Sequence, residues 1–237
     1  MIIRTVILFL FSSIVSYCYA SINVDRTRIV FEQKTDAISM TLSNNAEHPY
    51  LAQAWIENEK GEKSSEYFVV IPPIQRIEAN SKNQIKILKS VSHKLLSEDQ
   101  ESLFYLKIKE IPPKPIEGNI IQIALQSQLK IFYRPTNILT QQEQSWLKEI
   151  TVIYANKTLT LINPIAYYIN IADVIDKNGE IIIDVGYNML APFSSKEFIL
   201  SSQLSDKFQI GYIDDYGALR LFTYLYENKR YSLQNEG

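Results

Sequence analysis

The chain has very little cysteine, histidine and glycine, and each shortage excludes a kind of chemistry. Cys18 is its only cysteine, so the chain can form no internal disulfide and no cysteine-based zinc site. The two histidines, His48 and His93, do not stand at a metal-binding spacing. None of the seven glycines belongs to a phosphate-binding loop or a Gly-x-Ser-x-Gly motif. The sequence therefore predicts no metal site, no cofactor and no enzymatic activity.

The chain also lacks an apolar run of the length that a transmembrane helix needs, about 20 residues. Its longest apolar stretch, residues 6–15, follows Arg4 and ends shortly before the small residue Ala20. This order of features is typical of a secretory signal peptide. We expect cleavage after Ala20, which also removes Cys18, and an exported protein without membrane insertion.

A strong excess of charge of one sign is missing as well. The chain has 24 lysines and arginines against 26 aspartates and glutamates, a formal net charge of -2, and no basic block. Nucleic-acid-binding proteins usually carry a clustered positive surface. We therefore expect no nucleic acid partner.

Short runs of β-forming residues, separated by turn-forming clusters, recur along the whole chain after residue 20. No segment shows sustained helical periodicity. The spacing predicts an all-β protein of two immunoglobulin-like β-sandwich domains, residues 21–136 and residues 137–237. The expected strands are residues 28–31, 37–42, 50–56, 68–71, 84–88, 102–110 and 120–133, followed by 147–155, 158–163, 167–175, 181–187, 195–200, 208–213 and 219–226.

The last strand expected in the first domain is the most informative segment. Ile121, Ile123 and Leu125 alternate with polar or small residues, so in a strand they share one face. Alternation alone favours an ordinary core strand, and a strand that fills the groove of a partner has the same pattern. Lys130 has the opposite parity, so either two faces of the segment are used or a bulge shifts the phase.

Several short motifs follow one another at a definite spacing. They are DRTR (residues 25–28), YLAQAWI (50–56), PPIQRIE (72–78), ESLFY (101–105), KEIPP (109–113), LQSQLKIFYRP (125–135), NP with YY (163–164 and 167–168) and YIDDYG (212–217). Together they resemble the PapD-like family of periplasmic pilus chaperones over nearly the whole chain after residue 20. The resemblance implies two sandwiches in a boomerang arrangement.

The resemblance also implies a function. Members of this family bind pilin subunits by donor-strand complementation and deliver them to an outer-membrane usher, in the periplasm. By resemblance, the donor strand is residues 120–131, and Ile121, Ile123 and Leu125 are the inserted side chains. Arg28 and Lys130 match the two cations that anchor the C-terminal carboxylate of the pilin.

Two further features come from the same resemblance. Glu101, Arg134 and Asp215 match an interdomain charge cluster of the family, which sets the angle between the domains. Tyr226 and Tyr231 stand where PapD-like chaperones carry a disulfide near the end of the second domain. A disulfide typically contributes about 2–4 kcal/mol, so packing must replace that contribution here.

Two other classes are compatible with an exported β-protein. One is an adhesive or structural sandwich protein, such as a pilin, although a pilin lacks its seventh strand and this chain has a full first domain and a second one. The other is a secreted hydrolase, which the two histidines disfavour. The sequence leaves open whether free copies of the chain associate to cover an exposed strand edge.

Overall fold

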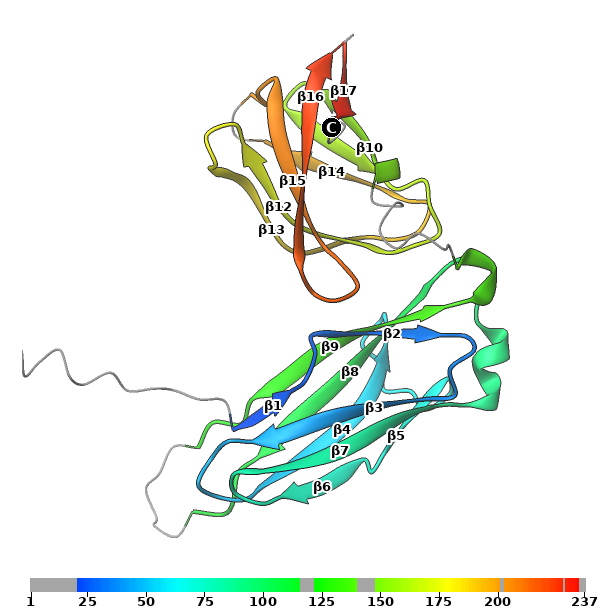
Figure 1. The fold of residues 1–237 in the computed structure, drawn as a ribbon, viewed down its shortest axis with the longest axis vertical. Helices are drawn as coiled ribbons and strands as arrows, with labels where there is room; N and C mark the ends of the chain where they lie inside the picture. The colour runs from blue at the N-terminus through cyan, green and yellow to red at the C-terminus, as the bar shows by residue number, and fades with distance from the viewer. Residues whose placement is uncertain (1–20, 116–121, 140–147, 201–202, 228, 235–237) are drawn as a thin grey trace, which may run out of the picture.

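Alternating apolar and polar residues fold into two β-sandwiches that follow one another along the chain (Figure 1). The computed structural model describes residues 21–115, 122–139, 148–200, 203–227 and 229–234. Within these residues the regular structure consists of strands and two short 3-10 helices, which confirms the all-β prediction. The leader expected over residues 1–20 lies outside the described residues.

The first sandwich packs a five-stranded sheet, in the order β2-β9-β8-β4-β6, against a four-stranded sheet, in the order β1-β3-β7-β5. Among the described strands, β2 and β9 form the one parallel pair, and the other pairs are antiparallel. The elements are β1 (Ile22–Val24), β2 (Arg28–Glu32), β3 (Ala37–Asn44), β4 (Tyr50–Asn58), β5 (Phe68–Ile71), β6 (Ile74–Ile77), β7 (Ser81–Lys89), η1 (Val91–Leu95), β8 (Ser102–Ile111), β9 (Gln126–Arg134) and η2 (Thr136–Ile138).

The second sandwich packs a three-stranded sheet, in the order β10-β11-β14, against a five-stranded sheet, in the order β13-β12-β15-β16-β17. Each described pair in it is antiparallel. The strands are β10 (Thr151–Ala155), β11 (Thr158–Ile162), β12 (Ile169–Asp176), β13 (Ile181–Leu190), β14 (Ser195–Ile199), β15 (Lys207–Ile213), β16 (Leu219–Glu227) and β17 (Arg230–Leu233).

Each sandwich has its own hydrophobic core, in which aromatic rings make edge, tilted or stacked contacts. In the first, Phe68 lies 4.9 Å from Phe31 and 5.1 Å from Phe104 between ring centroids. In the second, Phe208 lies 5.5 Å from Tyr224 and 5.0 Å from Tyr231. Burial of one such side chain stabilises a fold by about 1.5–3 kcal/mol, so each domain has an independent source of stability.

Each domain contains a buried asparagine that makes the same hydrogen bonds to the main chain, although the two sequences do not repeat. Asn44 and Asn163 are both buried and each donates its side-chain amide to the carbonyl of the residue four positions later, His48 or Tyr167, at 2.8 Å. Each also accepts a hydrogen bond from the main-chain N–H two positions later. A buried amide costs little when its partners are satisfied, so these asparagines secure the turns that follow β3 and β11.

The chain changes sheets between β1 and β2, and Asp25 secures this change. β1 pairs with β3 in the four-stranded sheet, whereas β2 pairs with β9 in the five-stranded sheet. The Asp25 carboxylate accepts hydrogen bonds from the Thr41 main-chain N–H at 3.0 Å and from Arg26 Nε at 2.9 Å. β2 therefore begins only at Arg28, and it covers only part of β9.

The hairpin between β15 and β16 reaches from the second domain toward β2 of the first, where the two sandwiches meet at an angle (Figure 1). Gly217 lies in this hairpin with a φ of +87°. A Cβ atom there would lie 2.5 Å from Thr27 Oγ1, closer than atoms can approach. Glycine thus permits both the turn and the close contact between the domains.

Candidate functional site

One side of β9 is only half covered. β2 pairs with β9 from Lys130 to Arg134, whereas β8 pairs with the other side of β9 from Gln126 to Tyr133. Among the residues that the structure describes, no strand pairs with residues 126–129 on the side of β2. Unpaired main-chain N–H and C=O groups at a sheet edge can accept a further strand.

Two cations stand where this open stretch ends. Arg28 and Lys130 are partners in the parallel register of β2 and β9, so their side chains are neighbours. Arg28 Nη1 donates to the Ile213 carbonyl at 3.2 Å, and its buried Nε has no hydrogen-bond partner in the described part of the chain. Lys130 Nζ donates to Asn170 Oδ1 at 2.5 Å. Neither cation forms an ion pair with a carboxylate of the described residues.

Burial makes both positive charges unfavourable. Desolvation lowers the pKa of Arg28 below its ordinary value, against the raising effect of the charges of Asp215 and Asp214. Desolvation, with the nearby charge of Arg28 as the second cause, lowers the pKa of Lys130 to about 8. An anion bound between the two side chains would relieve both effects, so the electrostatics favour a negatively charged ligand.

These cations face a cleft between the domains with a volume of about 710 Å³. β2 and β9 form one wall, and β12 and β15 form the other. Most of the lining side chains are polar, and Asp173 on the second wall is the one acidic residue among them. The lining residues are Thr27, Arg28, Gln126, Gln128, Lys130, Asn170, Ile171, Ala172, Asp173 and Ile213.

The strand expected over residues 120–133 is shorter in the structure, where β9 begins at Gln126. Ile121 lies outside the described residues. Ile123 and Leu125 precede β9 and are 73% and 49% exposed. The expected boundary was wrong because alternation reports a side-chain pattern, whereas a strand also needs a partner for its main chain.

The alternation within β9 explains the opposite parity of Lys130. Leu129, Ile131 and Tyr133 are buried in the core of the first domain. Lys130 has the other phase and faces the interdomain cleft. Ile123 and Leu125 share the phase of the core residues, so both faces of the segment have a use and no bulge is required.

The structure brings Glu101, Arg134 and Asp215 together at the domain junction. Arg134 donates from Nε to Glu101 Oε1 at 2.7 Å and makes two hydrogen bonds to Asp215, at 2.7 and 3.0 Å. Glu101 also accepts the Tyr168 main-chain N–H at 2.8 Å. Burial raises the pKa of Glu101 to about 7, against the lowering effect of Arg134. The cluster therefore links the two domains through a saturated set of donors and acceptors.

Tyr226 and Tyr231 are direct partners in the register of β16 and β17. Their ring centroids lie 5.0 Å apart, and the Tyr231 hydroxyl donates to the Ser205 carbonyl at 2.9 Å. Tyr231 also contacts Phe208 of the second core. Ring packing thus joins the two strands at the positions where the resemblance implies a disulfide in related chaperones.

Sequence reasoning did not identify Asn170, which holds Lys130 across the cleft, or the hydrogen bond from the Tyr168 hydroxyl to Glu59 at 2.8 Å. Asn170 and Tyr168 come from the second domain, whereas Lys130 and Glu59 come from the first. No local pattern marks such pairs, because their contact depends on how the two sandwiches are placed.

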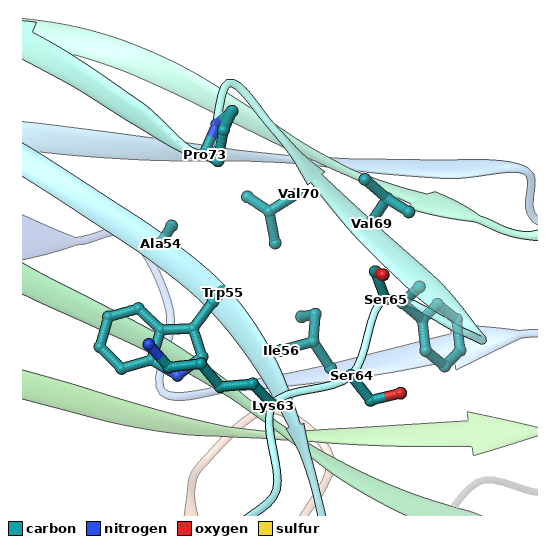
Figure 2. Close-up of a pocket in the computed structure, with 10 residues that line it drawn as sticks. Ala54, Trp55, Ile56, Lys63, Ser64, Ser65, Val69, Val70 and Pro73 are labelled. Carbon is teal, nitrogen blue, oxygen red and sulfur yellow. The ribbon is translucent and has the colours of Figure 1, made fainter.

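A smaller hollow of about 250 Å³ lies between β4 and β5, near the edge of the first domain that is opposite to β2 (Figure 2). Lys63 Nζ lies 4.4 Å from the centroid of the Trp55 ring, and the other lining side chains are mostly apolar. The hollow contains none of the site residues that the sequence analysis proposed, although Ala54, Trp55, Ile56 and Pro73 belong to two of its motifs.

The described residues contain no group of three or more histidine, cysteine, aspartate or glutamate side chains arranged to hold a metal ion. Within the same residues, no helix has the length and hydrophobicity needed to cross a membrane.

Comparison with known proteins identifies relatives of both domains. Residues 21–139 match the family described as pili and flagellar-assembly chaperone, PapD N-terminal domain, and residues 145–223 match the PapD C-terminal domain of pili assembly chaperones. The uncharacterized fimbrial chaperone YbgP of Escherichia coli strain K12 is 40% identical over 210 residues, 87% of each chain. The chaperone protein PapD of Escherichia coli is 33% identical over 227 residues, 94% of each chain.

Solved structures agree with this assignment. The CupB2 chaperone of Pseudomonas aeruginosa has a TM-score of 0.70 and 28% identity, with 89% of this chain and 100% of that chain covered. A chain from the complex of the Salmonella enterica SafA pilin with the SafB chaperone has a TM-score of 0.75 and 23% identity, with 89% and 98% covered, and shares the fold. The chain belongs to the PapD-like family of pilus-assembly chaperones.

Proposed function

We propose that this protein is a periplasmic chaperone that binds pilin subunits by donor-strand complementation. The observation that carries the proposal is the open edge of β9, which ends at two half-buried cations that form no ion pair with a carboxylate of the described residues. A pilin that lacks one strand offers the matching features, a strand with a free C-terminal carboxylate and an unfilled hydrophobic groove.

The direction of the bound strand follows from the sheet. β2 runs parallel to β9 and begins at Arg28, so it covers the edge from Lys130 onward. A strand of the subunit that covers residues 126–129 and ends with its carboxylate at Arg28 must run in the same direction as β2. It therefore also runs parallel to β9, and its C-terminus meets the beginning of β2.

Arg28 and Lys130 are the proposed anchor of that carboxylate. Hydrogen bonds between ionised partners are about twice as strong as neutral ones, and two cations can bind both carboxylate oxygens. Arginine offers a planar fork and lysine a point charge, so the two side chains contribute differently. A fixed anchor also sets the register of the subunit along β9.

Ile121, Ile123 and Leu125 are the proposed donor side chains. Ile123 and Leu125 are exposed in the free protein and continue the alternation of the core residues of β9. Burial of each aliphatic side chain in the groove of a subunit would contribute about 1.5–3 kcal/mol before the costs of ordering. The donor segment thereby supplies the apolar part of the contact, and the anchor supplies the polar part.

The finer assignments belong to the same proposal. Residues 1–20 are a leader cleaved after Ala20, residues 21–136 bind the subunit, and residues 137–237 form the second wall of the cleft. The protein acts without catalysis, in the periplasm, and passes its subunit to an outer-membrane usher. Support comes from relatives named as fimbrial chaperones and from the chaperone protein PapD of Escherichia coli.

Co-expression with pilin subunits in a bacterial periplasm tests the proposal. The wild-type protein should be isolated in a soluble complex with a subunit, whereas Ile123→Asp should remain folded and lose most of the subunit. Ile153→Asp is the matched control, because Ile153 is a 48% exposed isoleucine on β10 of the second domain. Equal capture by Ile123→Asp and the wild type would exclude the donor segment, and absence of any complex would exclude the function.

A further inference from the structure

Near the beginning of β9, on the neighbouring strand β8, lies a buried carboxylate that neither the anchor nor the interdomain cluster uses. Glu110 lies near the end of β8 and is only 5% exposed. Glu110 Oε2 accepts the Ile22 main-chain N–H at 3.1 Å, and Oε1 accepts the Leu125 main-chain N–H at 3.4 Å. One side chain therefore contacts both the first residue of β1 and the residue that precedes β9.

No lysine or arginine of the described residues forms an ion pair with Glu110. A buried carboxylate without a cation is unfavourable unless hydrogen-bond donors satisfy it. Here the donors are main-chain N–H groups of two segments that are far apart in the sequence, so the carboxylate is compatible with the fold only when both segments are in place.

The contact with Leu125 replaces part of the sheet ladder. Glu110 donates its main-chain N–H to the Leu125 carbonyl at 3.0 Å, as in a regular antiparallel pair. The Leu125 N–H instead donates to the Glu110 carboxylate. Regular pairing of β9 begins at Gln126. The carboxylate therefore binds Leu125 directly before the strand begins.

We propose that Glu110 is a positioning residue for the donor segment, an inference that rests on the proposed function. Glu110 fixes Leu125 at one end of the open edge, as Arg28 and Lys130 fix the subunit carboxylate at the other end. Leu125 and Ile123 then continue from β9 with the same side-chain parity as Leu129 and Ile131. The segment thereby presents its apolar side chains to the groove of a subunit. The partner of this end is the apolar groove of the pilin rather than its terminus.

The test compares Glu110→Gln with Glu66→Gln, a control glutamate that is exposed in the segment between β4 and β5. Glutamine keeps one acceptor oxygen and the side-chain volume, so the variant is suited to fold. Amide hydrogen exchange of the free protein is the first measurement. We expect exchange at Ile22 and Leu125 to accelerate by at least about tenfold in Glu110→Gln, with core amides such as that of Ile131 unchanged.

Binding is the second measurement, with a pilin subunit that co-purifies with the wild type and a synthetic peptide of its last five residues. The peptide reaches only the anchor and residues 126–129, whereas the subunit also covers the donor segment. We expect Glu110→Gln to weaken subunit binding about tenfold and to leave peptide binding within twofold of the wild type. Glu66→Gln should change neither.

Three outcomes would overturn the inference. They are unchanged exchange at Leu125, unchanged binding of the subunit, and an equal loss of peptide and subunit binding, which indicates a global effect. Failure of the proposed function looks different, because Arg28→Ala would then bind the peptide as well as the wild type does. Exchange at Leu125 in the free protein does not depend on any subunit, so the two failures can be told apart.

Discussion

Two groups of charged side chains include residues of β9 and differ in one respect, their ion pairing. Arg134, near the end of β9, makes hydrogen bonds to two carboxylates, Glu101 and Asp215. Arg28 and Lys130, at the beginning of the β2 and β9 pairing, have only a carbonyl and an amide as their hydrogen-bond partners in the described structure. Arg134 forms ion pairs with two carboxylates of the protein, whereas no carboxylate of the described residues forms an ion pair with Arg28 or Lys130.

The difference supports the proposed division between a structural role for Arg134 and a binding role for Arg28 and Lys130. A buried ion pair adds little net stability, but loss of one partner leaves an uncompensated charge and is costly, so the Arg134 cluster holds the domains in one arrangement. The anchor pair is already desolvated, and its cost is present before any ligand arrives. An incoming carboxylate therefore meets cations that are preorganised and have few competing partners.

The largest effect on binding should come from removal of Arg28 or Lys130, the two cations without an ion pair. Loss of one partner of a buried charge pair typically weakens binding by about 2–5 kcal/mol, so Arg28→Ala and Lys130→Ala should each weaken subunit binding by that amount. The double variant should capture no measurable subunit in a pull-down or calorimetric titration. Lys82→Ala, an exposed lysine on β7, is the control. Wild-type affinity in both single variants would mean that the two clusters do not differ in role.

Removal of Arg134 from its cluster with Glu101 and Asp215 should instead lower the stability of the fold. Arg134→Ala leaves Glu101 buried without a cation, and we expect the free energy of unfolding to fall by about 3–5 kcal/mol in denaturant titrations. Arg28→Ala removes one hydrogen bond to a carbonyl, so it should change the same quantity by at most about 1 kcal/mol. Similar losses of stability in the two variants would contradict the comparison.

A carboxylate introduced next to Lys130 should give this cation an ion-pair partner within the protein. Asn170 Oδ1 already lies 2.5 Å from Lys130 Nζ, so Asn170→Asp gives Lys130 an internal partner that competes with the subunit. We expect binding to weaken by about 1.5–3 kcal/mol, the range of a hydrogen bond to a charged group. Asn170→Ala is the matched control and should not weaken binding. An Asn170→Asp variant with unchanged affinity would show that Lys130 does not bind the carboxylate.

The smallest effect should be a dependence on pH. The pKa of Lys130 is about 8 in the free protein, so at higher pH the side chain must take up a proton before it can bind a carboxylate. Affinity should fall as pH rises through 8, by no more than about tenfold per pH unit. Between pH 8 and the ordinary lysine pKa the unfolded chain binds more protons than the folded one. The contribution of Lys130 to stability therefore rises over the same window.

Lys130→Arg provides the control for this pH dependence, because arginine stays protonated throughout the range. Its affinity for the subunit, measured by calorimetry from pH 7 to 9, should be flat where that of the wild type declines. An equal decline in both proteins would assign the titration to another group.

The strands and the all-β class could be predicted because burial imposes a two-residue period that survives in the sequence. The donor segment was only partly predictable. Its alternation predicts one face for Ile123 and Leu125, which stays a prediction, and the beginning of β9 at Gln126 depends on which main-chain groups find partners. Glu110, which takes the Leu125 N–H, carries no local signal for that role.

By itself, the sequence determined the alternation within strands, the turns and the motifs that resemble those of a known family. These features depend on residues that are close to one another along the chain. Only the tertiary structure decided that β2 stops short of covering β9, that Asn170 reaches Lys130, and that Arg134 forms ion pairs whereas Arg28 forms none with the described residues. The reason is physical. Whether a charge or a main-chain group has a partner depends on atoms that are distant in sequence, and here many of them belong to the other domain.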